Sequence, residues 1–240
     1  MSLMLNPAYR FSPLPTDTEQ YAKHSDVVLL YCAKAHGELN DAHLHRTERA
    51  VLAKRKKVQA QQEYRATRWA IKQLARQLYP QYRDYPLAAW CSEFDVEQAQ
   101  LILSIDGHPL DARVVISHAH GHIAVAMTRS AALLGVDIEK IDNARAFEKL
   151  AAHYYPEAEA RDIGRDVETF FRVWTLKEAY AKATKQPIAT LLGQPILELI
   201  AALDSQVYCQ ELFAGHFDIS LITDTQRPVL TVNLPAAVDE

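Results

Sequence analysis

The sequence contains few cysteines and no long apolar run. The three cysteines, Cys32, Cys91 and Cys209, lie far apart and form no C-x-x-C pair. This argues against a disulfide framework or a zinc–thiolate site and favours reduced thiols. No apolar run approaches the length of a membrane span, and the first residues lack a basic stretch followed by an apolar one. We therefore expect a cytoplasmic protein that does not contact a membrane.

An excess of positive charge is also lacking. The 240 residues carry a formal net charge of −4, with 49% apolar and 23% charged residues, which is typical of a globular protein with no general attraction to nucleic acid. Between residues 46 and 76, however, basic residues are frequent and only Glu48 and Glu63 are acidic. This stretch predicts one long helix or two consecutive helices with a basic face. Such a face, with its run at 54–57, is either a solvated surface or a binding surface for phosphates or an acidic protein.

Acidic and apolar residues alternate in the segment GVDIEK at 135–140. If it forms a strand, Asp137 and Glu139 project from the same face. A second segment further along the chain predicts a helix on which Glu178 and Lys182 lie one turn apart. Together they would offer three carboxylates and one lysine on two rigid elements. Mg²⁺ prefers oxygen ligands and is usually completed by phosphate oxygens of a substrate, so this set predicts a magnesium site beside a phosphate site.

Histidines and a serine suggest two other kinds of site. His118, His120 and His122 would share one face of a strand and could bind zinc, as in a zinc hydrolase. Gly121 instead favours a turn within this motif, and the chain has no H-E-x-x-H grouping. Ser117 and His118 are adjacent, so on a strand they point to opposite faces and cannot pair as nucleophile and base. The sequence therefore gives little support to a hydrolase of either kind.

Four blocks together resemble the signature of a known family. GVDIEK at 135–140 and WTLKEAYAK at 174–182 are similar to the paired motif of the 4'-phosphopantetheinyl transferases, of the larger, surfactin-synthetase-activating type. VISH at 115–118 lies where that family carries N-[IL]-S-H, and DGHP at 106–109 lies where it usually has Gly-Lys-Pro. The order and spacing of the blocks agree from about residue 45 to about residue 190.

The resemblance implies a fold and a division of the chain. It implies an α+β protein made of two similar α/β halves, related by a pseudo-twofold axis, with the site in the cleft between them. Residues 1–130 would form the N-terminal half, with the basic helix and the coenzyme A contacts. Residues 131–240 would form the C-terminal half, with the metal site and the catalytic helix.

The resemblance also implies a reaction, that of a holo-acyl-carrier-protein synthase. The 4'-phosphopantetheine group of coenzyme A would pass to a serine of an apo carrier protein (acyl, polyketide or peptidyl), with release of 3',5'-ADP. Asp137, Glu139 and Glu178 would hold Mg²⁺, and Asp137, Glu178 and Lys182 would be catalytic, with Glu178 as the base. The residues expected to bind coenzyme A are Arg49, His108, Ser117, His118 and Lys182. His108 replaces the usual lysine of the family, and we expect a monomer.

Two other classes of function remain open at this point. A metal-dependent phosphoesterase or nucleotide hydrolase could use the same acids, and a non-catalytic binding module could be built around the basic helix. The remaining elements are predicted from periodicity and from turn residues. We expect strands at 26–35, 98–105, 134–140, 196–202, 216–223 and 228–233, a hairpin at 112–128 that turns near His120 and Gly121, and helices at 145–155, 156–163 and 166–184.

Overall fold

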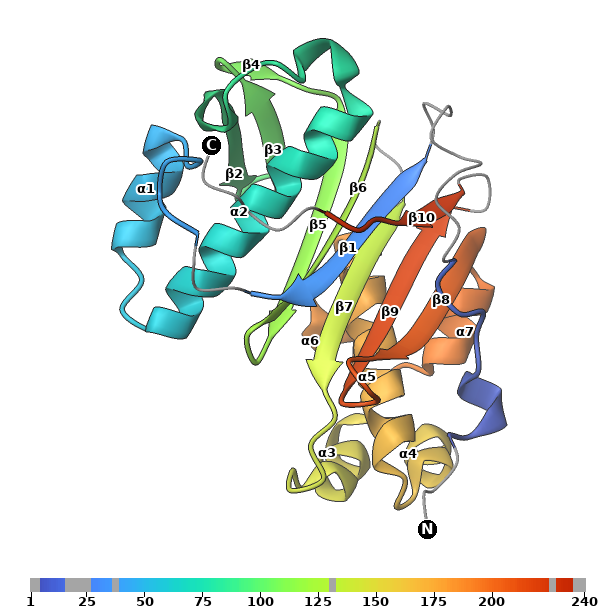
Figure 1. Cartoon of the computed structure of the whole chain (residues 1–240). Coiled ribbons are helices and arrows are strands. Elements are labelled where there is room, and N and C mark those ends of the chain that lie inside the picture. The colour runs from blue at the N-terminus through green and yellow to red at the C-terminus, as the bar shows by residue number, and fades with distance from the viewer. Residues whose placement is uncertain (1–4, 16–26, 36–38, 130–132, 225–227, 235–240) are drawn as a thin grey trace. The chain divides into compact units, whose positions relative to one another are not determined.

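The computed structural model describes residues 5–15, 27–35, 39–129, 133–224 and 228–234 (Figure 1). The chain divides into two compact units. One, here called the large-sheet unit, comprises residues 15–132 and 227–240, and the other, the small-sheet unit, comprises residues 1–14 and 133–226. Each unit combines a β-sheet with helices, which confirms the predicted α+β class.

The large-sheet unit contains a sheet in the order β10-β1-β6-β5-β3-β2, with β4 paired to β3. Strands β1 and β10 are parallel, and the other neighbours are antiparallel. Its strands are β1 (Val28–Lys34), β2 (Trp90–Asp95), β3 (Gln100–Ile105), β4 (His108–Pro109), β5 (Ala112–Ala119), β6 (His122–Arg129) and β10 (Val229–Thr231). Its helices are α1 (Arg46–Ala53), α2 (Val58–Leu78) and the short 3₁₀ turns η2 (Pro80–Tyr82) and η3 (Leu87–Ala89).

Two tight turns in this sheet depend on glycine. Asp106 and Gly107, which join β3 to β4, have φ values of 45° and 79°. His120 and Gly121, which join β5 to β6, have φ values of 48° and 77°. Two-residue hairpin turns of type I′ need positive φ at both central positions, a conformation in which glycine is unstrained. The hairpin predicted to turn near His120 and Gly121 is therefore confirmed.

Helix α2 buries one side against the large sheet. Ala70, Leu74 and Leu78 recur every four residues and are 0%, 0% and 6% exposed. They join the core that includes Trp90 of β2 and Leu103 of β3. This spacing places one apolar stripe of the helix on the sheet, and burial of that stripe stabilises the helix. The helix can be long because no glycine or proline interrupts residues 58–78.

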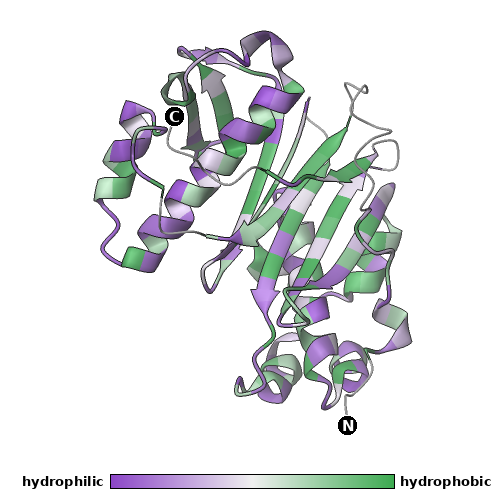
Figure 2. Cartoon of the chain, viewed as in Figure 1, coloured by the Kyte–Doolittle hydropathy of each residue, from purple (hydrophilic) through white to green (hydrophobic). Residues whose placement is uncertain are grey.

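The basic stretch forms two helices, α1 and α2, joined by a turn at 54–57. Figure 2 shows that this turn is hydrophilic, whereas the strands of the large sheet are mostly hydrophobic. Its three lysines are exposed, and Arg55 lies over the ring of Tyr64 at 4.6 Å. Val51 and Val58, on either side of the turn, are 41% and 69% exposed. The exposed surface here is both basic and partly apolar.

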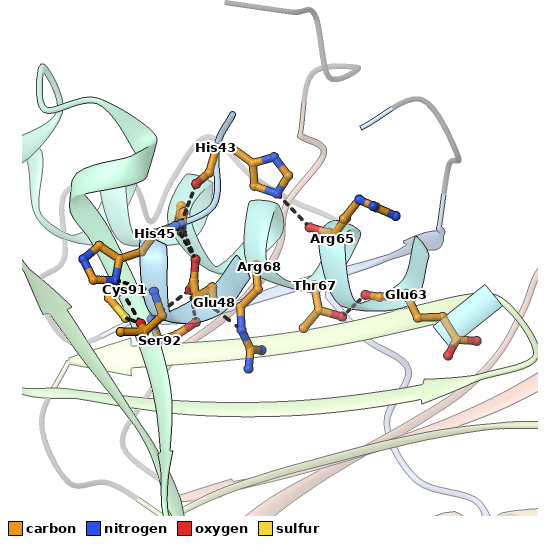
Figure 3. A network of polar contacts seen from close by, with 11 residues as sticks. His43, His45, Glu48, Glu63, Arg65, Thr67, Arg68, Cys91 and Ser92 are labelled. Carbon is orange, nitrogen blue, oxygen red and sulfur yellow. Dashed lines mark hydrogen bonds and ion pairs between the residues drawn. The ribbon is translucent and has the colours of Figure 1, made fainter. Parts of the chain in front are cut away.

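Two basic residues of this stretch, Lys72 and Arg68, are buried. Lys72 is fully buried, and its Nζ donates to Glu48 Oε2 and to the carbonyl of His43, each at 2.6 Å. Arg68 is 7% exposed, with its Nε 3.8 Å from Glu48 Oε1. Ser92 of β2 donates to the same oxygen from its backbone N–H and its hydroxyl (Figure 3). These two side chains therefore do not contribute to the exposed basic face, because this buried network uses them to tie α1 to α2 and β2.

The small-sheet unit contains a three-stranded antiparallel sheet in the order β7-β9-β8. Its strands are β7 (Leu134–Lys140), β8 (Ser205–Leu212) and β9 (Phe217–Asp224). Its helices are α3 (Phe147–Tyr154), α4 (Glu157–Ile163), α5 (Val167–Thr184), α6 (Ile188–Leu191), α7 (Ile196–Ala201) and the 3₁₀ turn η1 (Pro7–Tyr9). The residues of η1 belong to this unit, since the guanidinium of Arg172 in α5 donates to the carbonyl of Tyr9 at 3.3 Å.

The strand predicted at 196–202 is wrong, because the segment forms helix α7. Ile196 is buried, and Leu199 and Ile200 pack against the same core, so the apolar residues have helical spacing. Strands β2 and β8 were not predicted. Among the residues that the structure describes, no helix is long and apolar enough to cross a membrane.

Candidate functional site

The site predicted from the acidic residues is built where strand β7 meets helix α5. At Gly135 the two elements approach closely. A Cβ atom at this position would lie 1.9 Å from the carbonyl oxygen of Ala179 and 2.8 Å from the backbone nitrogen of Ala183. Only glycine allows this approach. As a result, the turn of α5 that carries Lys182 lies directly beside Asp137 of β7.

Lys182 and Asp137 form an ion pair at this contact. The Nζ of Lys182 donates to Asp137 Oδ1 at 2.7 Å and to the carbonyl of Val136 at 3.1 Å. The aspartate side chain is 6% exposed and the lysine side chain is 28% exposed. The lysine therefore fixes the carboxylate from one side while its own side chain stays partly exposed.

Glu139 and Glu178 interact electrostatically with this ion pair. Burial and the negative charges of Asp137 and Glu178 raise the pKa of Glu139 to about 7, and the guanidinium of Arg145 opposes this increase. Burial and the charge of Asp137 likewise raise the pKa of Glu178, and Lys182 opposes this increase. The structure thus brings together all four residues that the sequence grouped on β7 and α5.

The same set of oxygens fits a hard divalent cation chemically. A nearby cation reduces the electrostatic repulsion among three carboxylates, and oxygen donors are the ligands that Mg²⁺ prefers. In the described part of the chain, however, no group of three or more His, Cys, Asp or Glu side chains is already arranged to hold a metal ion. Because Asp137 is engaged by Lys182, coordination by this set would require its side chains to reorient.

Arg145 is a further charged residue of this region that the sequence did not single out. Its guanidinium lies 5.3 Å from the ring centroid of Trp174, 6.0 Å from that of Phe170 and 5.9 Å from that of Phe171. It also lowers the pKa of Glu139, against the effect of burial. A single arginine in a loop belongs to no sequence motif, so the sequence did not predict a role for Arg145. Its position became clear only from its contacts with the aromatic side chains of α5.

In the large-sheet unit, His118 is held by an acid of α2. Its Nδ1 lies 3.3 Å from Glu63 Oε2, and its side chain is 50% exposed. The backbone N–H of Gly121 donates to the other oxygen of Glu63 at 2.7 Å. Ser117 precedes His118 on β5 and is buried, whereas His118 is exposed, as expected for neighbours on opposite faces of a strand. The sequence predicted no role for Glu63, which is one of two acidic residues in the basic stretch at 46–76.

The other predicted coenzyme A residues lie on separate elements. Arg49 is exposed on α1, and its Nε donates to the carbonyl of Leu44 at 3.1 Å. His108 is exposed on β4, directly after the β3–β4 turn. Of the histidines weighed as a zinc site, His120 lies in the β5–β6 turn, outside the strand that carries His118. The turn therefore removes the shared strand face on which the zinc hypothesis depended.

Comparison with known proteins supports the family resemblance for one part of the chain. No curated protein matches it. A family model described as the 4'-phosphopantetheinyl transferase superfamily matches residues 133–232, a region that contains Asp137, Glu139, Glu178 and Lys182. The stretch that builds the acidic site is therefore similar to the 4'-phosphopantetheinyl transferase superfamily.

Proposed function

We propose that this protein transfers the 4'-phosphopantetheine group of coenzyme A to a serine hydroxyl of an apo carrier protein, in a magnesium-dependent reaction that releases 3',5'-ADP. The observation that supports this most is the coupled set of three carboxylates and Lys182, held at the contact of β7 with α5. This set lies in the region that matches the transferase superfamily. Within that superfamily we propose the surfactin-synthetase-activating type, because the blocks at 106–109 and 115–118 precede the acidic site in the expected order.

The proposed roles follow from the charges and positions of these side chains. Asp137, Glu139 and Glu178 would hold Mg²⁺, which offsets the negative charge of the diphosphate. Lys182, whose side chain is partly exposed, would donate a hydrogen bond from its ammonium group to a phosphate oxygen. A phosphoryl transfer site needs such positioning and charge stabilisation more than it needs covalent chemistry.

Glu178 is the proposed base. Burial and Asp137 raise its pKa, which makes its ionised carboxylate a better proton acceptor than an ordinary glutamate. The carboxylate would take the proton of the carrier serine while the serine oxygen forms a bond to the phosphorus next to the pantetheine arm. The bond from that phosphorus to the bridging oxygen breaks, and 3',5'-ADP leaves with the electron pair.

Residues of the large-sheet unit would bind the phosphates of coenzyme A. We assign this role to Arg49, His108, Ser117 and His118. Arg49, His108 and His118 are exposed, so their polar groups can contact a ligand without unfolding of any helix or strand. Because a histidine replaces the usual lysine at 108, the charge offered there depends on pH.

The test is mass spectrometry of apo acyl, polyketide and peptidyl carrier proteins, each incubated with this protein, coenzyme A and Mg²⁺. We expect at least one carrier to gain the mass of a phosphopantetheine group. Asp137→Ala and Glu178→Ala should each lower the rate by about a hundredfold or more while the fold is retained. Glu198→Ala, which changes an exposed acid on α7, is the matched control and should leave the rate unchanged.

Three outcomes would contradict the proposal. If no carrier gains mass, the protein is not a transferase for these substrates. If coenzyme A is cleaved while the carriers stay unmodified, the same acids serve a phosphoesterase. If carrier modification survives the loss of Glu178, the assignment of the base is wrong.

A further inference from the structure

The strongest unassigned feature is Glu63, which contacts both the β5–β6 turn and the strand that leads into it. One oxygen lies 3.3 Å from Nδ1 of His118, the second residue before the turn. The other accepts the backbone N–H of Gly121, within the turn, at 2.7 Å, and a proton of the Gln59 amide at 2.8 Å. A single carboxylate from α2 therefore fixes a hairpin tip and a half-exposed imidazole at the same time.

The environment of Glu63 indicates more than a structural role. Its side chain is 9% exposed, and a nearly buried carboxylate is costly unless its charge is compensated. Its hydrogen-bonding and ion-pair partners in the described part of the chain are Gln59, Gly121 and His118. Of these three contacts, only His118 can carry a positive charge. The charge of Glu63 also acts on His122, where it opposes the lowering of the pKa by burial. If the turn alone had to be held, a neutral glutamine would serve equally well.

We propose that Glu63 is a positioning residue that orients the imidazole of His118 toward a phosphate group of coenzyme A. This inference rests on the proposed function, in which His118 binds coenzyme A. A carboxylate only accepts hydrogen bonds, so this contact favours the form of His118 that carries a proton on Nδ1. Nε2 is then the nitrogen left for the ligand, and in the doubly protonated ring it donates to a phosphate oxygen.

The geometry also explains why the acid comes from a helix rather than from the hairpin. Helix α2 is anchored in the core of the large-sheet unit, whereas the turn is held mainly by its two strands. A ligand contact must be held closely in place to be effective, and a rigid element provides this better than a loop does. Through its contact with Nδ1, Glu63 restricts the movement of the His118 imidazole relative to the anchored helix α2.

The first test is a double-mutant cycle read by calorimetric binding of coenzyme A. Glu63→Gln preserves size and an acceptor for Gly121 but removes the charge. We expect it to weaken coenzyme A about three- to tenfold. The KM for the carrier and kcat should change little. In the His118→Ala background, Glu63→Gln should cause no further weakening, because the residue acts through the imidazole. Glu97→Gln, at an exposed acid of the β2–β3 loop, is the control and should leave coenzyme A binding unchanged.

Two results of this cycle would overturn the proposal. One is unaltered binding of coenzyme A by Glu63→Gln. The other is an equal loss in both backgrounds, which would mean that Glu63 supports the fold without acting through His118. Thermal unfolding of each variant shows whether it remains folded under the conditions of the measurement.

The second test needs no variant. Nitrogen NMR of the unaltered protein reports which ring nitrogen of neutral His118 carries the proton. We expect Nδ1–H, and an Nε2–H ring would overturn the proposal even if Glu63→Gln failed to fold. Failure of the proposed function is recognised separately: unaltered protein would modify no carrier, while calorimetry and NMR would still report on the contact between Glu63 and His118.

Discussion

Replacing Gly135 with alanine should damage both the stability and the activity of this protein. The new Cβ would lie 1.9 Å from the carbonyl oxygen of Ala179, where ordinary contacts begin at 3.4 Å, so β7 and α5 must separate by about 1.5 Å. Overpacking of a core usually costs about 1–3 kcal/mol. Both nearest atoms belong to the backbone of a central helix and cannot rotate away, so we expect about 3 kcal/mol. For a chain of this size that corresponds to a decrease in melting temperature of roughly 6–12 °C.

The same separation should lower turnover, because it moves Lys182 away from Asp137. A misplacement of about 1 Å in a catalytic site can cost about a hundredfold in rate, and we expect a loss of that order in the carrier mass-shift assay. Stability is measured by calorimetric or circular-dichroism melting. Gly193→Ala is the matched control in the same unit, since a Cβ there meets nothing within 4 Å. A Gly135→Ala protein that melts within about 2 °C of the original and retains full turnover would refute the argument from close approach.

Three further predictions concern charge. Glu139→Gln should raise the melting temperature of the metal-free protein at pH 8, and this increase should become smaller toward pH 5. The pKa of Glu139 in the folded protein is about 7, so above that pH its ionised carboxylate destabilises the folded state by at most about 3 kcal/mol. The protonated carboxyl group, which predominates at lower pH, does not have this cost. A benefit that does not depend on pH would show that burial and the neighbouring carboxylates do not raise the pKa of Glu139 in the folded protein. Reversing the charge of the exposed lysines at 54–57 should raise the KM for the carrier but not for coenzyme A, and high salt should shrink the effect, whereas changing Arg49 should weaken coenzyme A instead; equal effects on both substrates would mean that these residues are wrongly assigned. Transfer should require Mg²⁺ or Mn²⁺ and not zinc, and stoichiometric zinc that is lost on changing His120 and His122 would restore the hydrolase hypothesis.

Much of the small-sheet unit could be predicted because its signals are local. The alternation in residues 134–140 and the long apolar pattern of 166–184 each specify one element, and both elements form with nearly the predicted bounds. The hairpin turn at Gly121 was predicted for the same reason, since positive φ is a property of single residues. Segment 196–202 was misread because a short apolar run fits either a strand or a helix, and only packing against the core decides between them.

The sequence by itself determined the pattern of the site: two acids on one face of a strand, and an acid and a lysine one turn apart on a helix. Only the tertiary structure decided what these residues meet. The close approach at Gly135 pairs Lys182 with Asp137, and the folding of α2 onto β5 gives His118 its partner Glu63. Local patterns record the direction in which each side chain points from its own element. Contacts between elements arise from burial of apolar surface across the whole unit, which no short segment encodes.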